Sequence, residues 1–176
     1  MKKMKKIISV IERIIIKTTS YINTKVYMKL YIRYLKKNGM NIQGNPMYIS
    51  SDVYFDGKDY TKITLSENVT ISREVMFLTH DYSMHTVHRG LEIKNRKKVI
   101  LNDSKDKLLI LKEISIGRNS FIGARSSLLP GTIIGENVLV GACSVVKGNI
   151  PDNSIVIGNP AKIVGTTSEW IDKKMN

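Results

Sequence analysis

Three histidines fall within one short stretch of the chain, LTHDYSMHTVH, at His80, His85 and His88. Imidazole changes charge between about pH 5 and 8, so a histidine can take a proton from a hydroxyl group near neutral pH. Asp81 follows His80 directly, but adjacent residues on a strand point to opposite sides of it. These residues make His80 a candidate general base, and they make Asp81 and His85 candidates for contact with a substrate.

A six-residue repeat indicates the elements that position these side chains. It runs from Ile116 to Pro151, and its hexads begin with Ile116, Ile122, Leu128, Ile134, Val140 and Val146. Four of the six residues that follow these aliphatic positions are glycine. Apolar residues spaced six apart fit neither an amphipathic helix nor a simple amphipathic strand. They predict a parallel β-helix, in which one aliphatic side chain per hexad stacks on its equivalents in the neighbouring coils.

The same pattern extends toward the N-terminus with small changes. The hexads LSENVT, ISREVM and FLTH place Leu65, Ile71 and Phe77 at the inward position, and serine replaces the corner glycine. Residues 40–62 are predicted to form irregular early coils. The glycines are expected at the corners because a positive φ is easiest for glycine.

The repeat stops after His80 and resumes at LILKEISIG. The intervening residues, 81–112, are dense in charge at EIKNRKKVILNDSKDK, so they cannot form β-helix core. We expect them to leave the scaffold as an extruded loop, and long loops on rigid scaffolds often carry function. His80 therefore occupies the last regular position before this loop.

The positive charge is concentrated at the N-terminus. The net charge is +13, and residues 1–39 contribute nine Lys and two Arg against Glu12 alone. The remaining residues are close to neutral, which argues against nucleic-acid binding by the main body. The predicted architecture has three parts: a basic helical arm at 1–39, the β-helix at 40–165 and a C-terminal tail with a short helix at 166–176.

The basic arm is predicted to hold two helices. The first has one apolar face, formed by Met4, Ile7, Ile8, Ile11, Ile14 and Ile15. The second runs from about Tyr21 to Lys37 and ends at Asn38-Gly39. Two roles remain open for this arm. It can cover the exposed edge of the first coil, or residues 1–37 can make peripheral contact with an anionic membrane.

The repeat and the segment IGNPAKIVG resemble the hexapeptide-repeat acyltransferases, a family of left-handed β-helices that includes galactoside, maltose and polysaccharide O-acetyltransferases. The resemblance covers roughly residues 63–165. It implies a saccharide O-acetyltransferase of surface glycans that uses acetyl-CoA. It also implies that His80 is the catalytic base, because the family places its histidine where the coil departs into a loop.

The resemblance implies further site residues. Ala124 and Ala142 match positions that contact the pantetheine arm of coenzyme A, and Lys162 matches a basic residue near its phosphates. Lys147 is a further candidate, one residue earlier in the chain than the corresponding lysine of the family. Asp52, in an early coil, is the remaining candidate for contact with the acceptor. The family is trimeric with sites between subunits, so a homotrimer is expected.

Other readings of the sequence stay open. The acceptor can be a xenobiotic or the amine of an amino sugar, or the β-helix can be a scaffold or a metal-dependent lyase. Three histidines close together at the start of one loop do not reproduce the zinc ligands of β-helix carbonic anhydrases, so no metal is expected.

Cys143 falls at a hexad position where a small residue belongs, and we interpret it as a residue that fills space in the packing of the coils. Glu12 and Arg13 interrupt the apolar region of the N-terminal segment, which is atypical of a signal peptide. The expected location is the cytoplasm, at the inner face of the membrane.

Overall fold

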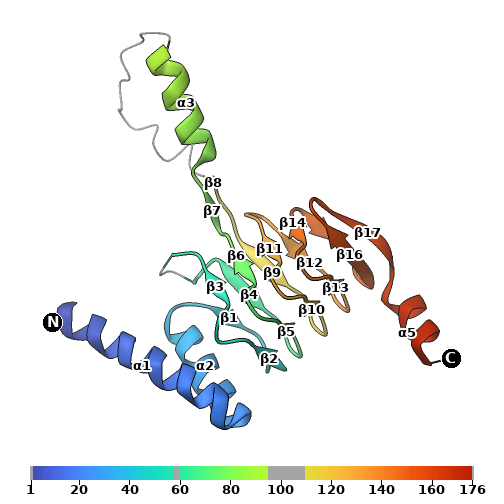
Figure 1. The fold of residues 1–176 in the computed structure, drawn as a ribbon, viewed down its shortest axis with the longest axis horizontal. Coiled ribbons are helices and arrows are strands. Elements are labelled where there is room, and N and C mark those ends of the chain that lie inside the picture. Colours follow the sequence, from blue (N-terminus) through green and yellow to red (C-terminus); the bar gives the residue numbers. More distant parts are fainter. Residues whose placement is uncertain (1, 58–59, 95–109, 176) are drawn as a thin grey trace.

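The structure is a computed structural model that describes residues 2–57, 60–94 and 110–175. Short strands follow one another around three sheets, so that successive turns of the chain add one strand to each sheet in order (Figure 1). Sheet A has the order β1-β4-β9-β12-β15, sheet B the order β2-β5-β10-β13-β16-β17, and sheet C the order β3-β6-β11-β14. Within them only β16 and β17 pair antiparallel. The chain therefore forms a parallel β-helix, as predicted, and its three corners are named here the A–B, B–C and C–A edges.

The strands are short because each spans one face of the prism. Their bounds are β1 (Asn41–Ile42), β2 (Tyr48–Ile49), β3 (Tyr54–Phe55), β4 (Ile63–Leu65), β5 (Thr70–Ile71), β6 (Met76–Phe77), β7 (His80–Asp81), β8 (Ile110–Leu111), β9 (Ile114–Ile116), β10 (Phe121–Ile122), β11 (Ser127–Leu128), β12 (Ile133–Ile134), β13 (Leu139–Val140), β14 (Val145–Val146), β15 (Asn149–Ile150), β16 (Ser154–Gly158) and β17 (Ala161–Thr166). Phe121 pairs with Leu139 on the next coil, so three hexads complete one turn.

The aliphatic residues of the hexads form the core of the prism. All six predicted positions from Ile116 to Val146 are at most 2% exposed. Leu65, Ile71 and Phe77, the predicted inward residues of the earlier coil, are fully buried. The parallel pairing brings each of them beside its equivalent one coil away, as Ile71 lies beside Ile122 and Phe77 beside Leu128. The inward stack predicted from the repeat is confirmed.

The corner glycines have a different role from the one predicted. Positive φ occurs two residues after the corner position, at Asn119, Arg125, Asn137 and Cys143, with φ between 55° and 59°. The glycines themselves approach the next coil, since a Cβ added to Gly123 would lie 2.5 Å from the backbone nitrogen of Ala142. The hexad therefore needs glycine for close packing of backbones rather than for its φ angle.

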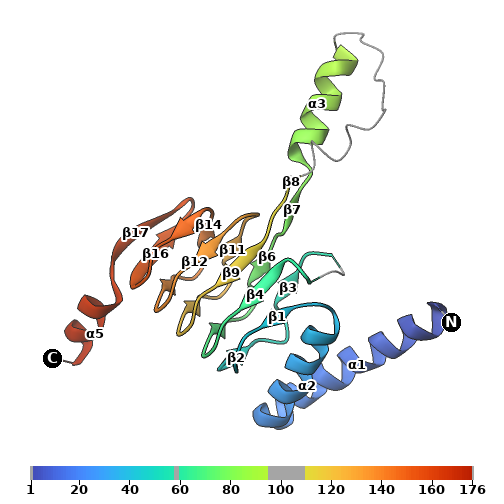
Figure 2. The same ribbon diagram turned by 180° about the vertical axis from the view of Figure 1, so that it is seen from behind.

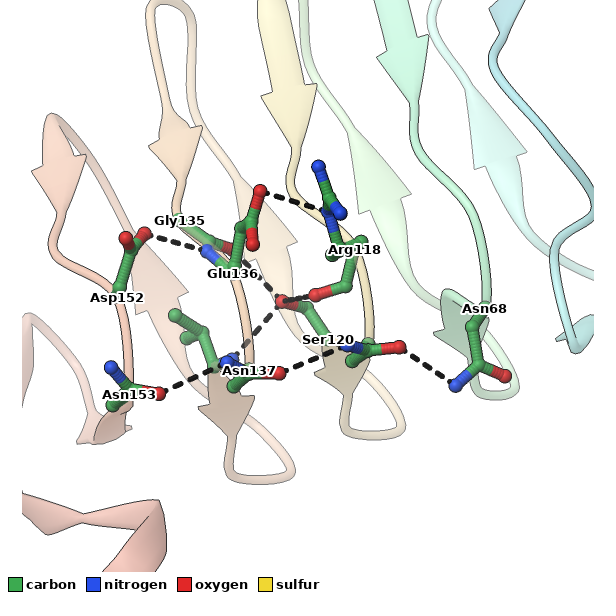
Figure 3. A network of polar contacts seen from close by, with 10 residues as sticks. Asn68, Arg118, Ser120, Gly135, Glu136, Asn137, Asp152 and Asn153 are labelled. Carbon is green, nitrogen blue, oxygen red and sulfur yellow. Dashed lines mark hydrogen bonds and ion pairs between the residues drawn. The ribbon is translucent and has the colours of Figure 1, made fainter.

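A ladder of asparagine side chains runs along the A–B edge (Figure 3). Asn68, Asn119, Asn137 and Asn153 each adopt a positive φ and join in sequence through amide hydrogen bonds of 2.9, 3.0 and 3.0 Å. Asparagine tolerates the left-handed conformation better than most residues. The ladder links four coils along one edge, and the hexad pattern did not reveal it.

Two helices close the N-terminal end of the β-helix (Figures 1 and 2). They are α1 (Lys2–Ile22) and α2 (Thr24–Lys37), separated at Asn23, which caps α2 through the backbone nitrogen of Val26. In α2, Tyr27 and Leu35 are fully buried against the first coil. The hydroxyl of Tyr27 donates a 2.5 Å hydrogen bond to the carbonyl oxygen of Ile49, at the end of β2. Helix α2 therefore covers the open end of the core.

Replacing Tyr27 by phenylalanine is expected to lower the free energy of unfolding by about 1–3 kcal/mol, because the buried carbonyl of Ile49 then loses its donor. Chemical denaturation measures this difference. Tyr21→Phe is the matched control, since Tyr21 is 81% exposed on α1. Equal unfolding midpoints for the two variants would show that the hydroxyl of Tyr27 does not secure the cap.

Helix α1 packs on the body through a residue outside its predicted apolar face. The side chain of Ile16 is buried, whereas Ile11, Ile14 and Ile15 of the predicted apolar face remain 51–60% exposed. Glu12 forms an ion pair of 2.6 Å with Lys37 of α2. The contact with the body therefore uses Ile16 and Glu12, and much of the apolar face of α1 stays open to solvent.

The remaining elements leave the prism at two places. β7 and β8 pair antiparallel as a neck, and α3 (Ser83–Lys94) projects from it away from the coils (Figure 2). The sequence predicted this excursion but not its helix, and residues 95–109 of its charged middle lie outside the described residues. After β17, at the C-terminal end of the β-helix, α5 (Thr167–Met175) is the predicted short C-terminal helix. No helix in the described part of the chain is long and apolar enough to cross a membrane.

Candidate active site

His80 forms a close pair with a carboxylate that the sequence did not single out. Its Nδ1 lies 2.5 Å from Oδ2 of Asp56, and the side chains are 26% and 14% exposed. Both residues lie on the C–A edge, where the second coil opens into β7 and the excursion. The imidazole and the ring of Tyr82 form a T-shaped pair, with the ring centroids 5.4 Å apart.

Stacking of two coils creates this pair. β3 lies parallel to β6, with Phe55 beside Phe77, and the backbone nitrogen of Asp56 donates to the carbonyl of Phe77. The residue that follows β3 is thereby held against the chain that follows β6. Paired positions of β3 and β6 are 22 residues apart in the sequence, as Phe55 and Phe77 show. Counting back by one coil from the residues around His80 is the signal that could have located Asp56.

The contact with Asp56 decides which ring nitrogen of His80 is available. A carboxylate can only accept, so a neutral imidazole in this contact carries its proton on Nδ1 and leaves Nε2 as an acceptor. The carboxylate also stabilises the imidazolium that forms when Nε2 takes a proton. The geometry is therefore that of a general base with an orienting carboxylate.

Asp81 serves the neck of the excursion. Its Oδ1 accepts a 2.7 Å hydrogen bond from the backbone nitrogen of Ser83, at the start of α3. The hydrogen bonds from Ser83 lower the pKa of Asp81, and the positive charge of Lys147 acts in the same direction. Asp81 thus orients the first turn of α3, while Lys147 lies on the same edge as His80.

His85 and Asp52 are not brought into contact with His80. His85 is a half-buried residue of α3, beyond the neck. Asp52 lies on the B–C edge and accepts hydrogen bonds from the hydroxyl of Ser50 and from Arg73. Burial acts to raise the pKa of Asp52, but these hydrogen bonds outweigh burial and lower it. Across residues 2–57, 60–94 and 110–175, no three His, Cys, Asp or Glu side chains gather as metal ligands.

The predicted coenzyme A residues fall on two edges of the prism. Ala124 and Ala142 stack on the B–C edge, where the carbonyl of Ala124 accepts from Cys143. Lys147 lies on the C–A edge after β14, two coils beyond β6. At the usual spacing between strands, two coils correspond to about 10 Å along the axis of the β-helix. Lys162 is exposed on β17, the last strand of sheet B. Within one chain the two alanines and His80 therefore lie on different edges.

The hexad repeat of the coils resembles that of a known family. Residues 113–148 match the family model described as bacterial transferase hexapeptide (six repeats). The predicted resemblance to this family is confirmed, and with it the left-handed β-helix with its N-terminal helices and its short C-terminal helix.

Similar proteins carry acetyltransferase names. One is 34% identical over 106 residues, 60% of this chain and 54% of its own length, and is named as the lipopolysaccharide biosynthesis O-acetyl transferase WbbJ of Escherichia coli. Another, the acetyltransferase SAV2555 of Staphylococcus aureus, is 33% identical over 127 residues, 72% of this chain and 55% of its own. The chain spans about half the length of these curated relatives.

A solved structure with the same fold is a galactoside acetyltransferase in complex with coenzyme A. It superposes with a TM-score of 0.56 at 19% identity and covers 93% of this chain and 84% of its own. Its coverage therefore extends well beyond residues 113–148, the segment that matches the family model.

Proposed function

We propose that this protein transfers an acetyl group from acetyl-CoA to a hydroxyl group of a saccharide in the modification of surface glycans. The observation that carries the proposal is the contact between His80 and Asp56 at the edge where the coil opens. The names of the relatives, an O-acetyl transferase of lipopolysaccharide biosynthesis among them, support the reaction and the class of acceptor.

The reaction is a direct transfer between two bound substrates. The acceptor oxygen attacks the carbonyl carbon of the acetyl thioester, and Nε2 of His80 takes the hydroxyl proton as the new C–O bond forms. The oxyanion of the tetrahedral intermediate is stabilised by a backbone N–H. Collapse breaks the C–S bond, and the departing thiolate takes the proton from the imidazolium. Asp56 keeps the ring oriented through both proton transfers.

The separation of the predicted coenzyme A residues from His80 supports a homotrimer. Ala124 and Ala142 cannot meet His80 of their own chain, because the prism separates the B–C and C–A edges. A cyclic arrangement can place the B–C edge of one copy against the C–A edge of the next, and it then creates equivalent sites between subunits. Lys147 on the C–A edge and Lys162 on β17 supply positive charge for the phosphates of the donor.

The assay that tests this function mixes the purified protein with acetyl-CoA and a panel of saccharides, and it follows thiol release and acetyl ester formation. The panel includes an amino sugar and a small xenobiotic amine, so that O- and N-transfer are separated by the product. Acceptor-dependent ester formation is the expected result. Amide products alone, or thiol release that no acceptor stimulates, would contradict it.

We also propose that α1 holds the protein against the cytoplasmic face of an anionic membrane. Ile11, Ile14 and Val10 are each more than half exposed on α1, within an arm that carries nine Lys and two Arg. Exposed apolar residues beside basic ones are typical of helices that lie in a lipid surface. Ile16 of α1 is buried against the body, whereas these apolar side chains remain accessible to solvent.

Vesicle sedimentation tests the membrane contact. The protein is expected to bind vesicles that contain phosphatidylglycerol and not those of phosphatidylcholine alone, and Ile11→Asp with Ile14→Asp should remove the binding. Ile133→Asp is the control, because Ile133 is 51% exposed on the β-helix. Binding that is equal on both vesicle types, or that survives the changes in α1, would leave α1 without this role.

A further inference from the structure

A cavity lined by aromatic and basic residues ends beside the His80–Asp56 pair. It has a volume of about 390 Å³ and lies between α1, α2 and the residues around β3. Ligand pockets commonly occupy about 300–1,000 Å³, so it can hold a sugar ring. Gly57 forms part of its wall, and a Cβ on Gly57 would lie 3.8 Å from Cε1 of His80. Gly57, next to Asp56 in the chain, therefore connects the wall of the cavity with the His80–Asp56 pair.

The wall of the cavity combines flat rings with hydroxyl groups. Tyr34, Tyr54 and Tyr60 line it, and Tyr54 is 52% exposed. A tyrosine offers an apolar face on which a sugar ring can stack and a hydroxyl for hydrogen bonding. Burial, the first cause, raises the pKa of Tyr60, and a hydrogen bond with Tyr34 adds to this effect. The phenol of Tyr60 is therefore a neutral group that can exchange hydrogen bonds with saccharide hydroxyls.

Two cations of α1 face the same space. Arg13 and Lys17 line the cavity from one side of the helix, one turn apart. Among the described residues, neither forms an ion pair with a carboxylate, although Glu12 beside them pairs with Lys37. The charge of Arg13 is felt by the hydroxyl groups of Tyr31 and Tyr60 across the cavity. A neutral saccharide would form no ion pair with either cation.

We infer that the acceptor is an acidic saccharide, a pyranose bearing a carboxylate or a phosphate, whose anionic group is bound by Arg13 and Lys17 while its ring lies against the tyrosines. Guanidinium and ammonium groups bind carboxylate and phosphate oxygens through charge-assisted hydrogen bonds. With the anion held at α1, the ring extends along β3 toward Gly57 and presents a hydroxyl to His80. This inference rests on the proposed function for the identity of the site.

The test measures binding separately from catalysis. Full-length protein is titrated calorimetrically, at physiological ionic strength, with glucuronic acid, glucose 1-phosphate and glucose. At least one anionic sugar is expected to bind about 10- to 100-fold more tightly than glucose, the effect of a hydrogen bond between charged groups. Arg13→Gln with Lys17→Gln should remove this preference. Comparison of the carboxylate and the phosphate distinguishes the two sources of negative charge.

The control pair is Lys25→Gln with Lys29→Gln, which removes two exposed lysines of α2 that do not line the cavity. If both double variants lose the preference for anionic sugars alike, the basic arm as a whole attracts the ligand and the inference is overturned. Equal affinity of the parent protein for glucose, glucuronic acid and glucose 1-phosphate would also overturn it. If neutral sugars are acetylated as efficiently as acidic ones, the inference fails while the proposed reaction stands. If acidic sugars bind through Arg13 and Lys17 but no sugar is acetylated, the inference stands and the reaction fails.

Discussion

Replacing His80 by alanine is expected to lower kcat by about 10²–10⁴, the usual contribution of a positioned general base. A hydroxyl acceptor is almost fully protonated near neutral pH, so the attacking oxygen depends on Nε2 of His80. The histidine is 26% exposed at the C–A edge and contributes no aliphatic side chain to the core stack, so the fold should survive the change. Thiol release at saturating acetyl-CoA and acceptor measures the effect.

His85→Ala is the matched control for this variant, because His85 lies on α3 beyond the neck. We expect it to retain kcat within a few-fold. Melting curves of both variants should overlay that of the parent protein. If His80→Ala keeps its full kcat, another group must accept the proton and the assignment of the base is wrong.

Asp56→Asn is expected to have the second largest effect, a fall in kcat of about 10- to 100-fold, since hydrogen bonds to charged groups contribute about 1.5–3 kcal/mol. The amide preserves the shape of the side chain but carries no charge to stabilise the imidazolium of His80. The loss therefore arises in the transition state, and the KM for acetyl-CoA should change little. Initial rates over a range of both substrates separate these quantities.

Asp52→Asn is the control for Asp56, since both carboxylates lie in the first coil. Asp52 bonds to Ser50 and Arg73 on the B–C edge, so its loss should affect stability more than kcat. An equal loss of kcat in the two variants would mean that the effect reflects the first coil as a whole rather than the contact with His80.

The core of the β-helix could be predicted because burial and sequence period coincide there. Each inward residue, such as Ile122 or Leu128, packs against its equivalent in the next coil. The six-residue repeat is therefore enough to predict all the buried positions of the stack. The corners were harder. Glycine suggests a positive φ, but Gly123 is required by the approach of the next backbone, and the positive φ falls on Arg125. The close contact at Gly123 is with the backbone of the next coil, about 18 residues later, so the residues around Gly123 in the sequence do not reveal it.

The candidate site was predictable only in part for the same reason. His80 was visible because the repeat ends there, which is a local event in the sequence. Its partner Asp56 comes from the previous coil, 24 positions earlier, and only the register of β3 with β6 brings them together. Asp52 had the same residue type in the same coil, but the fold directs it to another edge. The burial of Ile16 on α1 likewise depends on α2 and the first coil.

The most direct test of the central claim is a rapid-mixing experiment that follows the first turnover. The protein is mixed with acetyl-CoA alone, or with acetyl-CoA and the best acceptor of the panel, while free thiol and protein mass are recorded. Direct transfer with His80 as base predicts no thiol release before the acceptor is added, and then release in step with ester formation. A stoichiometric burst of thiol from acetyl-CoA alone, with an acetyl group added to the protein, would demonstrate an acyl-enzyme and contradict the account.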